Sequence, residues 1–170
     1  MKRGSKRATR SPRSTHFDAQ GRARMVDVGA KPATAREAIA RGRIELSAEA
    51  LHAVVSGTAA KGDVLGVARI AAIQAAKRTA EWIPLCHPLP LDALEIDFAP
   101  EAEPPAIAIE ARARTTAKTG VEMEALVAVS AAALAIYDMC KSIDRGMVIG
   151  ALRLVRKSGG KSGTYARPGG

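Results

Sequence analysis

The sequence has 170 residues, which fits one domain, because a single hydrophobic core usually splits only beyond about 250 residues. It is 47% hydrophobic but only 3% aromatic, so the core must be built largely from Ala, Val, Leu and Ile. This composition excludes disorder throughout the chain. It also argues against a membrane protein, since no uninterrupted apolar stretch approaches the roughly 20 residues that span a bilayer.

The net charge of +9 is concentrated at the two ends. Residues 1–24 hold eight basic residues and one acid, and residues 155–170 hold four basic residues and no acid, whereas residues 25–154 are slightly acidic. We therefore expect a disordered basic arm over 1–24, a folded domain over 25–157 and a flexible Gly/Lys-rich tail over 158–170. Basic ends can bind nucleic acid through phosphates, but a solvated end is favoured here.

The arm has no apolar segment after its charges, so it does not have the pattern of a signal peptide. The two cysteines, Cys86 and Cys140, then indicate reduced thiols and a cytoplasmic protein.

In chain order, the first expected element is a strand over residues 38–46. Ser47 is a good N-cap for a short helix that ends at Gly57, and Asp63 caps a long helix that runs to near Trp82, where Pro84 stops it. The apolar stripe expected on this long helix consists of Val64, Val67, Ala68, Ala71 and Ala75.

Two alternating segments follow, over residues 94–98 and 107–114, and predict an antiparallel hairpin joined by residues 101–105. A second long helix is expected from Thr119 or Gly120 to about Lys141, and a last strand over 147–155. The order predicts a ferredoxin-like α+β sandwich: a four-stranded antiparallel sheet with two long helices on one face, plus a short helix. We expect oligomerisation to cover Ile107, Ile109, Leu152 and Leu154 on the open face.

Two loop segments are candidates for chemistry. Lys61 precedes a helix N-terminus, where the helix dipole favours an anion. On this segment alone, however, an ordinary exposed lysine beside a capped helix is the favoured interpretation. His87 stands in a proline-rich loop after Cys86, where an acid–base or substrate-contacting role and a packed loop residue are equally supported. No second Cys or His lies at ligand spacing, so a metal site is not expected.

The second long helix carries its charges only at its two ends. Glu122 and Glu124 suit the positive end of the helix dipole, whereas Asp138 lies in the last turn, at the negative end. Lys141 is three residues further on the same face, so the two form an ordinary ion pair or a proton-transfer pair. The sequence slightly favours proton transfer.

The glycine-rich segment Lys157-Ser158-Gly159-Gly160-Lys161-Ser162-Gly163 contains Gly-Lys-Ser but is no P-loop. That motif needs a glycine where Val155 stands, and no helix can follow. A basic strap that closes over phosphates is the alternative.

The sequence resembles the cyclic pyranopterin monophosphate synthase family (molybdenum cofactor biosynthesis protein C family) from about residue 25 to residue 163, and it departs from the family pattern at none of the functional positions. The motifs that carry this resemblance are Met25-Val26-Asp27-Val28, Lys61-Gly62-Asp63, Ala75-Ala76-Lys77-Arg78-Thr79, Ile83-Pro84-Leu85-Cys86-His87-Pro88-Leu89, Lys118-Thr119-Gly120-Val121-Glu122-Met123-Glu124-Ala125-Leu126, Tyr137-Asp138-Met139-Cys140-Lys141 and the glycine-rich segment above.

The resemblance implies a lyase that converts (8S)-3′,8-cyclo-7,8-dihydroguanosine 5′-triphosphate to cyclic pyranopterin monophosphate and pyrophosphate. It implies a ferredoxin-like fold assembled as a homohexamer, a trimer of dimers, with sites at a subunit interface. It implies Asp138 as catalytic acid/base, Lys141 as its partner and Lys61 as a further catalytic or phosphate-contacting lysine. The implied substrate-binding residues are Leu85, Cys86, His87, Glu122, Met123, Glu124, Lys31, Arg36, Lys157 and Lys161.

No resident cofactor or metal is expected, although Mg²⁺ can accompany the triphosphate. The rival hypotheses are a nucleic-acid-binding module that uses the basic ends and a purely structural oligomer. Five aromatic residues in the chain offer little for base stacking, so no nucleic-acid partner is expected.

Overall fold

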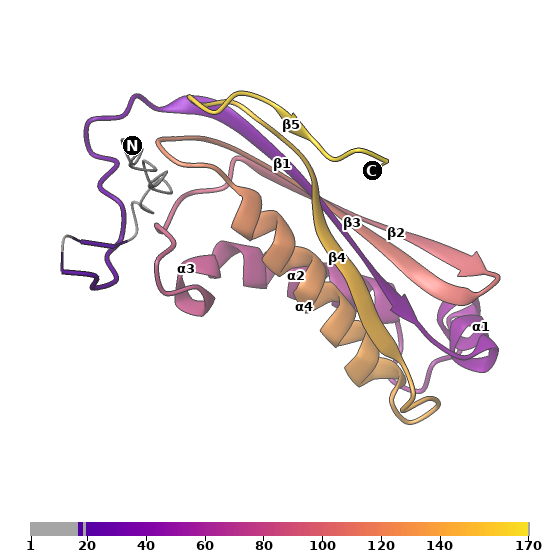
Figure 1. Ribbon diagram of the computed structural model, residues 1–170. Helices are drawn as coiled ribbons and strands as arrows, with labels where there is room; N and C mark the ends of the chain where they lie inside the picture. Colours follow the sequence, from indigo (N-terminus) through magenta and orange to yellow (C-terminus); the bar gives the residue numbers. More distant parts are fainter. Residues whose placement is uncertain (1–16, 19, 170) are drawn as a thin grey trace, which may run out of the picture.

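A computed structural model describes residues 17–18 and 20–169 (Figure 1). The expected arm, residues 1–24, therefore lies largely outside the described residues. The centre of the fold is a five-stranded antiparallel sheet in the order β2-β3-β1-β4-β5. Its strands are β1 (Thr34–Glu45), β2 (Ala93–Ala102), β3 (Pro105–Ala117), β4 (Val148–Ser158) and β5 (Tyr165–Ala166).

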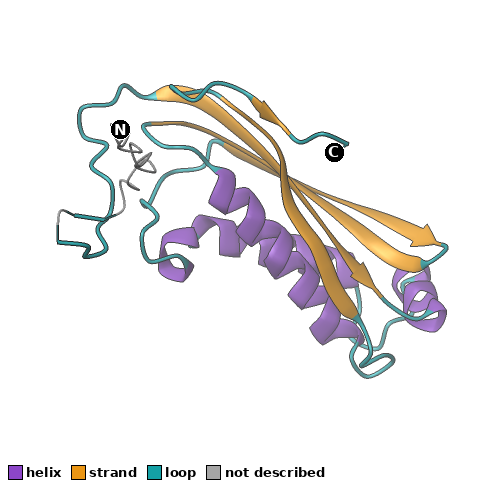
Figure 2. Ribbon diagram, viewed as in Figure 1, coloured by secondary structure: helices purple, strands orange, loops and turns teal. Residues whose placement is uncertain are grey.

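Helices cover one face of this sheet, as Figure 2 shows. They are α1 (Ala48–Ser56), α2 (Val64–Lys77), α3 (Thr79–Trp82) and α4 (Glu122–Cys140). The prediction of an α+β protein with two long helices on one sheet face is confirmed. The predicted count of four strands is wrong, because β5 pairs with β4 inside the segment expected to be a tail.

The local signals at the helix ends were predicted correctly. Ser47 Oγ accepts from the Ala50 amide, Asp63 accepts from the Gly66 amide, and Gly57 ends α1 with φ of 71°. The predicted continuous helix to Trp82 is wrong, because α2 ends at Lys77 and the Arg78 backbone leaves the helical region at φ −117°. The buried Thr79 hydroxyl donates to the Ala76 carbonyl at 3.0 Å and so satisfies one of the last carbonyls of α2.

Most strands are longer than predicted. β1 begins at Thr34, and β2 and β3 continue until only Glu103 and Pro104 join them. Beyond the predicted ends, the strands continue with charged and small residues. A prediction based on alternating apolar residues does not detect these positions. At the start of α4 the opposite holds, since the helix begins at Glu122 and not at Thr119 or Gly120.

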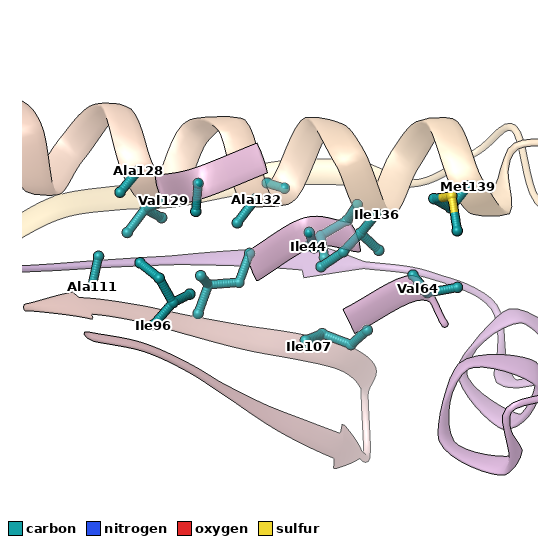
Figure 3. Close-up of a cluster of buried hydrophobic side chains, with 14 of the residues drawn as sticks. Ile44, Val64, Ile96, Ile107, Ala111, Ala128, Val129, Ala132, Ile136 and Met139 are labelled. Atoms are coloured by element: carbon teal, nitrogen blue, oxygen red, sulfur yellow. The ribbon is translucent and has the colours of Figure 1, made fainter. Parts of the chain in front are cut away.

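The hydrophobic core lies between the sheet and α4, with α2 packed beside α4 (Figure 3). The largest fully buried side chains are Ile44, Ile107, Ile109, Ile136, Val121, Val129 and Cys140. The buried stripe of α2 consists of Val64, Ala68, Ala72, Ala75 and Ala76. These small side chains let α2 and α4 pack closely. The prediction that Val67 belongs to this stripe is wrong, because Val67 is 44% exposed.

Among the described residues, α4 is also the one helix long and apolar enough to cross a membrane. About 61% of its apolar window is buried inside the fold, which is the pattern of a core helix packed on a sheet.

The open face of the sheet is charged, which corrects the predicted reason for oligomerisation. Ile107 and Ile109 are on the helix-covered face and are buried, and Leu154 packs against the same core. Of the four residues expected to need cover, only Leu152 is largely exposed. The open face instead carries ion pairs between strands. Arg41 of β1 pairs with Glu110 of β3 at 2.6 Å, and Arg114 of β3 pairs with Glu95 of β2 at 2.6 Å. Arg43 of β1 reaches across β3 to Glu101 of β2 at 2.8 Å.

Candidate active site

A pocket of about 400 Å³ lies at the N-terminal end of α4. Its walls come from three separate parts of the chain: residues 26–31 before β1, the proline-rich loop after α3, and the first turn of α4. Seven of the predicted substrate-binding residues line it, namely Lys31, Leu85, Cys86, His87, Glu122, Met123 and Glu124.

Glu124 is the buried titratable group of this pocket. Only 4% of the residue is exposed, and burial, with a further contribution from the charge of Glu122, raises the pKa of Glu124 to about 7. At neutral pH its carboxyl therefore exchanges a proton readily, which suits a group that gives or takes a proton. Burial, with a contribution from the charge of Glu124, also raises the pKa of the Cys86 thiol, which favours its neutral form.

A second pocket, of about 800 Å³, adjoins the first and shares Lys31, Thr119, Gly120 and Glu122 with it. Five cationic side chains and a single carboxylate line this cavity: Lys31, Arg36, Lys118, Lys157 and Lys161, with Glu122. Lys157 lies 3.4 Å from Glu122 and also donates to the Ser162 hydroxyl. Such a cluster attracts a multiply charged anion.

Backbone contacts hold Arg36 in this second pocket. Its Nε donates to the Ala117 carbonyl at 2.9 Å, and one terminal nitrogen donates to the Lys118 carbonyl at 3.3 Å. Gly160, with φ of 70°, lies against the guanidinium so closely that a side chain there would collide with it. The glycine-rich segment thus folds back against β1, and Lys161 lines the same pocket as Lys31.

The third group of charges is at the other end of α4. The Asp138 carboxylate lies 2.7 Å from Lys141 Nζ and 2.9 Å from Lys61 Nζ, and Lys61 also donates to the Asp138 carbonyl. Hydrogen bonds from Lys141 and then Lys61 lower the pKa of Asp138 to about 2, and the same contact raises the pKa of Lys141. This group is an exposed carboxylate held between two ammonium groups.

All thirteen predicted site residues thus fall into two groups at opposite ends of one helix. Glu124 and Asp138 are 14 residues apart on α4, which is about 21 Å at 1.5 Å per residue. The sequence prediction of an Asp138–Lys141 contact agrees with the geometry, and Lys61 joins it from 77 residues away. Within one copy of the chain, the group of Asp138, Lys141 and Lys61 is therefore separate from the two pockets.

The family model that matches this sequence is the MoaC family, over residues 25–160. The chain belongs to the MoaC family. A relative named cyclic pyranopterin monophosphate synthase, from Pelotomaculum thermopropionicum, is 60% identical over 155 residues, which cover 91% of each chain. Relatives with the same name from Thermomicrobium roseum and Roseiflexus sp. are 58% and 60% identical and cover 90% and 89% of this chain, and 92% and 96% of their own.

The MoaC-family match begins at Met25, which is also the predicted start of the folded domain. Other residues that line the pockets of this MoaC-family chain were not predicted as site residues, namely Val26, Val28, Leu89, Pro32, Thr34, Lys118, Thr119, Gly120, Gly160 and Ser162. The alternation of residues 25–28 already signalled Val26 and Val28 as one face of an extended segment. Lys118 carried no such signal, because its partner in space is 89 residues away.

Proposed function

We propose that this MoaC-family chain is a cyclic pyranopterin monophosphate synthase of molybdenum cofactor biosynthesis. It converts (8S)-3′,8-cyclo-7,8-dihydroguanosine 5′-triphosphate to cyclic pyranopterin monophosphate and releases pyrophosphate, as a phosphorus–oxygen lyase. The observation that carries the proposal is the pair of adjoining pockets, one lined by five cations and the other by a buried carboxyl. A substrate with a triphosphate at one end and a purine-derived base at the other matches this division.

The cationic pocket binds the triphosphate. Lys31, Arg36, Lys157 and Lys161 neutralise its charge, and Arg36 offers a planar, permanently charged group. The same cations stabilise the negative charge that develops on pyrophosphate as it leaves. Lys31 stands where the two pockets join, so its ammonium reaches the phosphate nearest the base.

The carboxyl-lined pocket holds the base between Leu85, Cys86 and His87 on one side and Met123 and Glu124 on the other. Opening the five-membered ring of the guanine and closing a pyrazine ring need several proton transfers. Glu124, with a pKa of about 7, exchanges protons near neutral pH. Asp138, with a pKa of about 2, is a carboxylate at neutral pH, so it begins the reaction as the base and Lys141 as the acid.

A complete site takes residues from two copies of the chain, because about 21 Å of α4 separates Asp138 from Glu124 within one copy. The C-terminal end of α4 of one copy meets the N-terminal pockets of another, in a homohexamer built as a trimer of dimers. The strand order β2-β3-β1-β4, with α2 and α4 as the crossovers, supports the ferredoxin-like arrangement that such an assembly uses.

The enzyme acts in the cytoplasm, since Cys86 and Cys140 are free cysteines. It needs no resident cofactor, and Mg²⁺ enters only as a counterion of the triphosphate.

The test of the function is release of pyrophosphate from the cyclised dihydro-GTP by the purified protein, with the pterin product identified by mass. Dependence of pyrophosphate release on this substrate, with GTP as the control nucleotide, is the expected result. Absence of product at saturating substrate would overturn the proposal. A single-stranded oligonucleotide added in the same assay tests the rival function, and we expect it to leave turnover unchanged.

Subunit complementation tests the shared site. We expect Asp138→Asn and Glu124→Gln proteins to be nearly inactive when each is assayed alone. Refolded together, they form mixed pairs in which one of two sites keeps both wild-type residues, so a substantial part of the activity should return. Failure of the mixture to exceed its two components, although mixed oligomers form, would show that one copy supplies both residues.

A further inference from the structure

Residues 26–31 form one wall of the carboxyl-lined pocket without belonging to the sheet. Val26 and Val28 are half-buried and line the pocket, whereas Asp27 between them is exposed. Local turns shape the segment: the Gly29 amide donates to Asp27 Oδ1 at 2.8 Å, and the Lys31 amide donates to the Val28 carbonyl at 3.0 Å. Neither bond ties the segment to the rest of the fold.

Two side chains from distant parts of the chain make that connection. His87 Nε2 lies 2.7 Å from the Val26 carbonyl, and Lys118 Nζ donates to the Gly29 carbonyl at 2.6 Å. His87 comes from the loop after α3, and Lys118 comes from the turn between β3 and α4. The two bonds therefore fasten this wall of the pocket to the loop after α3 and to the turn before α4.

We propose that His87 and Lys118 are positioning residues that clasp residues 26–31 against the pocket and thereby fix the Lys31 ammonium where the two pockets join. The proposal deepens the proposed function, because Lys31 is a phosphate ligand there. Fixing Lys31 in advance removes part of the ordering cost of substrate binding.

The clasp also determines what His87 can do. A carbonyl oxygen only accepts, so Nε2 must carry a proton and donate it to the Val26 carbonyl. The Nε2 proton of His87 is therefore engaged in holding the segment, as expected of a positioning residue.

The decisive experiment measures the mobility of the segment directly. A nitroxide label on Ala30→Cys, an exposed position in the segment, reports its motion by electron paramagnetic resonance, with wild-type protein treated in parallel to detect label on Cys86 or Cys140. Adding Lys118→Met should make the label clearly more mobile in the protein without substrate, whereas Lys118→Arg, which keeps a cationic donor, should not. Equal label mobility in the Lys118→Met and parent proteins would overturn the clasp.

Kinetics separate positioning from direct substrate contact. In unlabelled protein, Lys118→Met should raise KM roughly tenfold, the size expected for one charged hydrogen bond, with kcat within about threefold. Lys161→Met is the matched control, because it removes a cation from the same pocket and should raise KM without changing label mobility. A rise in KM for Lys118→Met with unchanged mobility would assign Lys118 to direct phosphate contact and contradict the proposal.

His87 needs its own pair of variants. Glutamine offers an N–H close to the position of Nε2, so His87→Gln should show much less of the rise in KM and in label mobility that His87→Ala causes. Equal kcat losses in both variants, with the label immobile in His87→Gln, would make His87 a catalytic residue. If the wild-type protein turns over no cyclised dihydro-GTP, the proposed function fails, and label mobility still decides whether the clasp exists.

Discussion

The two ends of α4 carry carboxyl groups in opposite states. Glu124 in the first turn is 4% exposed, and burial raises its pKa to about 7. Asp138 in the last turn is exposed between Lys141 and Lys61, which lower its pKa to about 2. One helix thus presents a carboxyl that is partly protonated at neutral pH and a carboxylate that is fully ionised.

The comparison shows that environment, and not residue type, assigns these roles. At the first turn the pocket walls remove water, and the cost of burying charge favours the neutral acid. At the last turn two ammonium groups compensate both the charge and the unfavourable end of the helix dipole. Acid–base chemistry that needs both a proton donor and a proton acceptor can use the two ends together when two copies of the chain meet.

The largest expected effect follows removal of the charge at the last turn. Asp138→Asn keeps the shape of the side chain but provides no base, and we expect kcat to fall by roughly 10²–10⁴. Pyrophosphate release under single-turnover conditions measures it. Circular dichroism and the elution volume should stay unchanged, because the side chain is exposed. Activity within threefold of wild type would remove Asp138 from the chemistry.

At the first turn, the expected effect is on stability and depends on pH. The folded-state pKa of Glu124 is raised from 4.5 to about 7, so the folded protein binds more protons than the unfolded chain between these values. Stability from this group is therefore complete below about pH 4.5 and is lost as the pH rises through about 7. Glu124→Gln avoids this loss and should be more stable than wild type by about 3 kcal/mol at pH 8, and by less than about 1 kcal/mol at pH 5.

Urea unfolding at the two pH values measures this difference. Glu122→Gln is the control, because Glu122 is in the same turn but is paired with Lys157. Asp138 does not interfere: its lowered pKa makes its contribution disappear only as the pH falls through about 2. A Glu124→Gln protein with the same stability difference at both pH values would contradict the raised pKa.

Contacts near in sequence were predictable, and contacts across the fold were not. Ser47, Gly57 and Asp63 act within one turn of their helices, so their capping roles were clear from the sequence. The two faces of β3 were also predictable from the sequence. Glu110 and Arg112 lie on one face because side chains alternate along a strand, so Ile107 and Ile109 lie on the opposite, covered face. This alternation contradicts the prediction that Ile107 and Ile109 need cover on the open face.

The site was predictable as a set of residues but not as an arrangement. Asp138 and Lys141 are on adjacent positions of one helix face, whereas Lys61 joins them only because α2 packs on α4. Similarly, β5 forms because three glycines with positive φ turn the chain back along β4. The periodicity of a single segment predicts neither the Lys61–Asp138 contact nor the β4–β5 pairing, because each depends on which elements pack together.

The smallest expected effect concerns metal, and it follows from the states of the two carboxyls. Asp138 is occupied by two lysines and Glu124 is partly protonated, and the described residues hold no cluster of three or more possible ligands. Mg²⁺ prefers several ionised oxygens, which the triphosphate of the proposed substrate offers, while five cations already line the pocket proposed to bind it. We therefore expect EDTA to change KM by less than about threefold and to leave kcat unaltered. Complete loss of turnover in EDTA, restored by Mg²⁺ alone, would show that the metal does work that the lysines cannot.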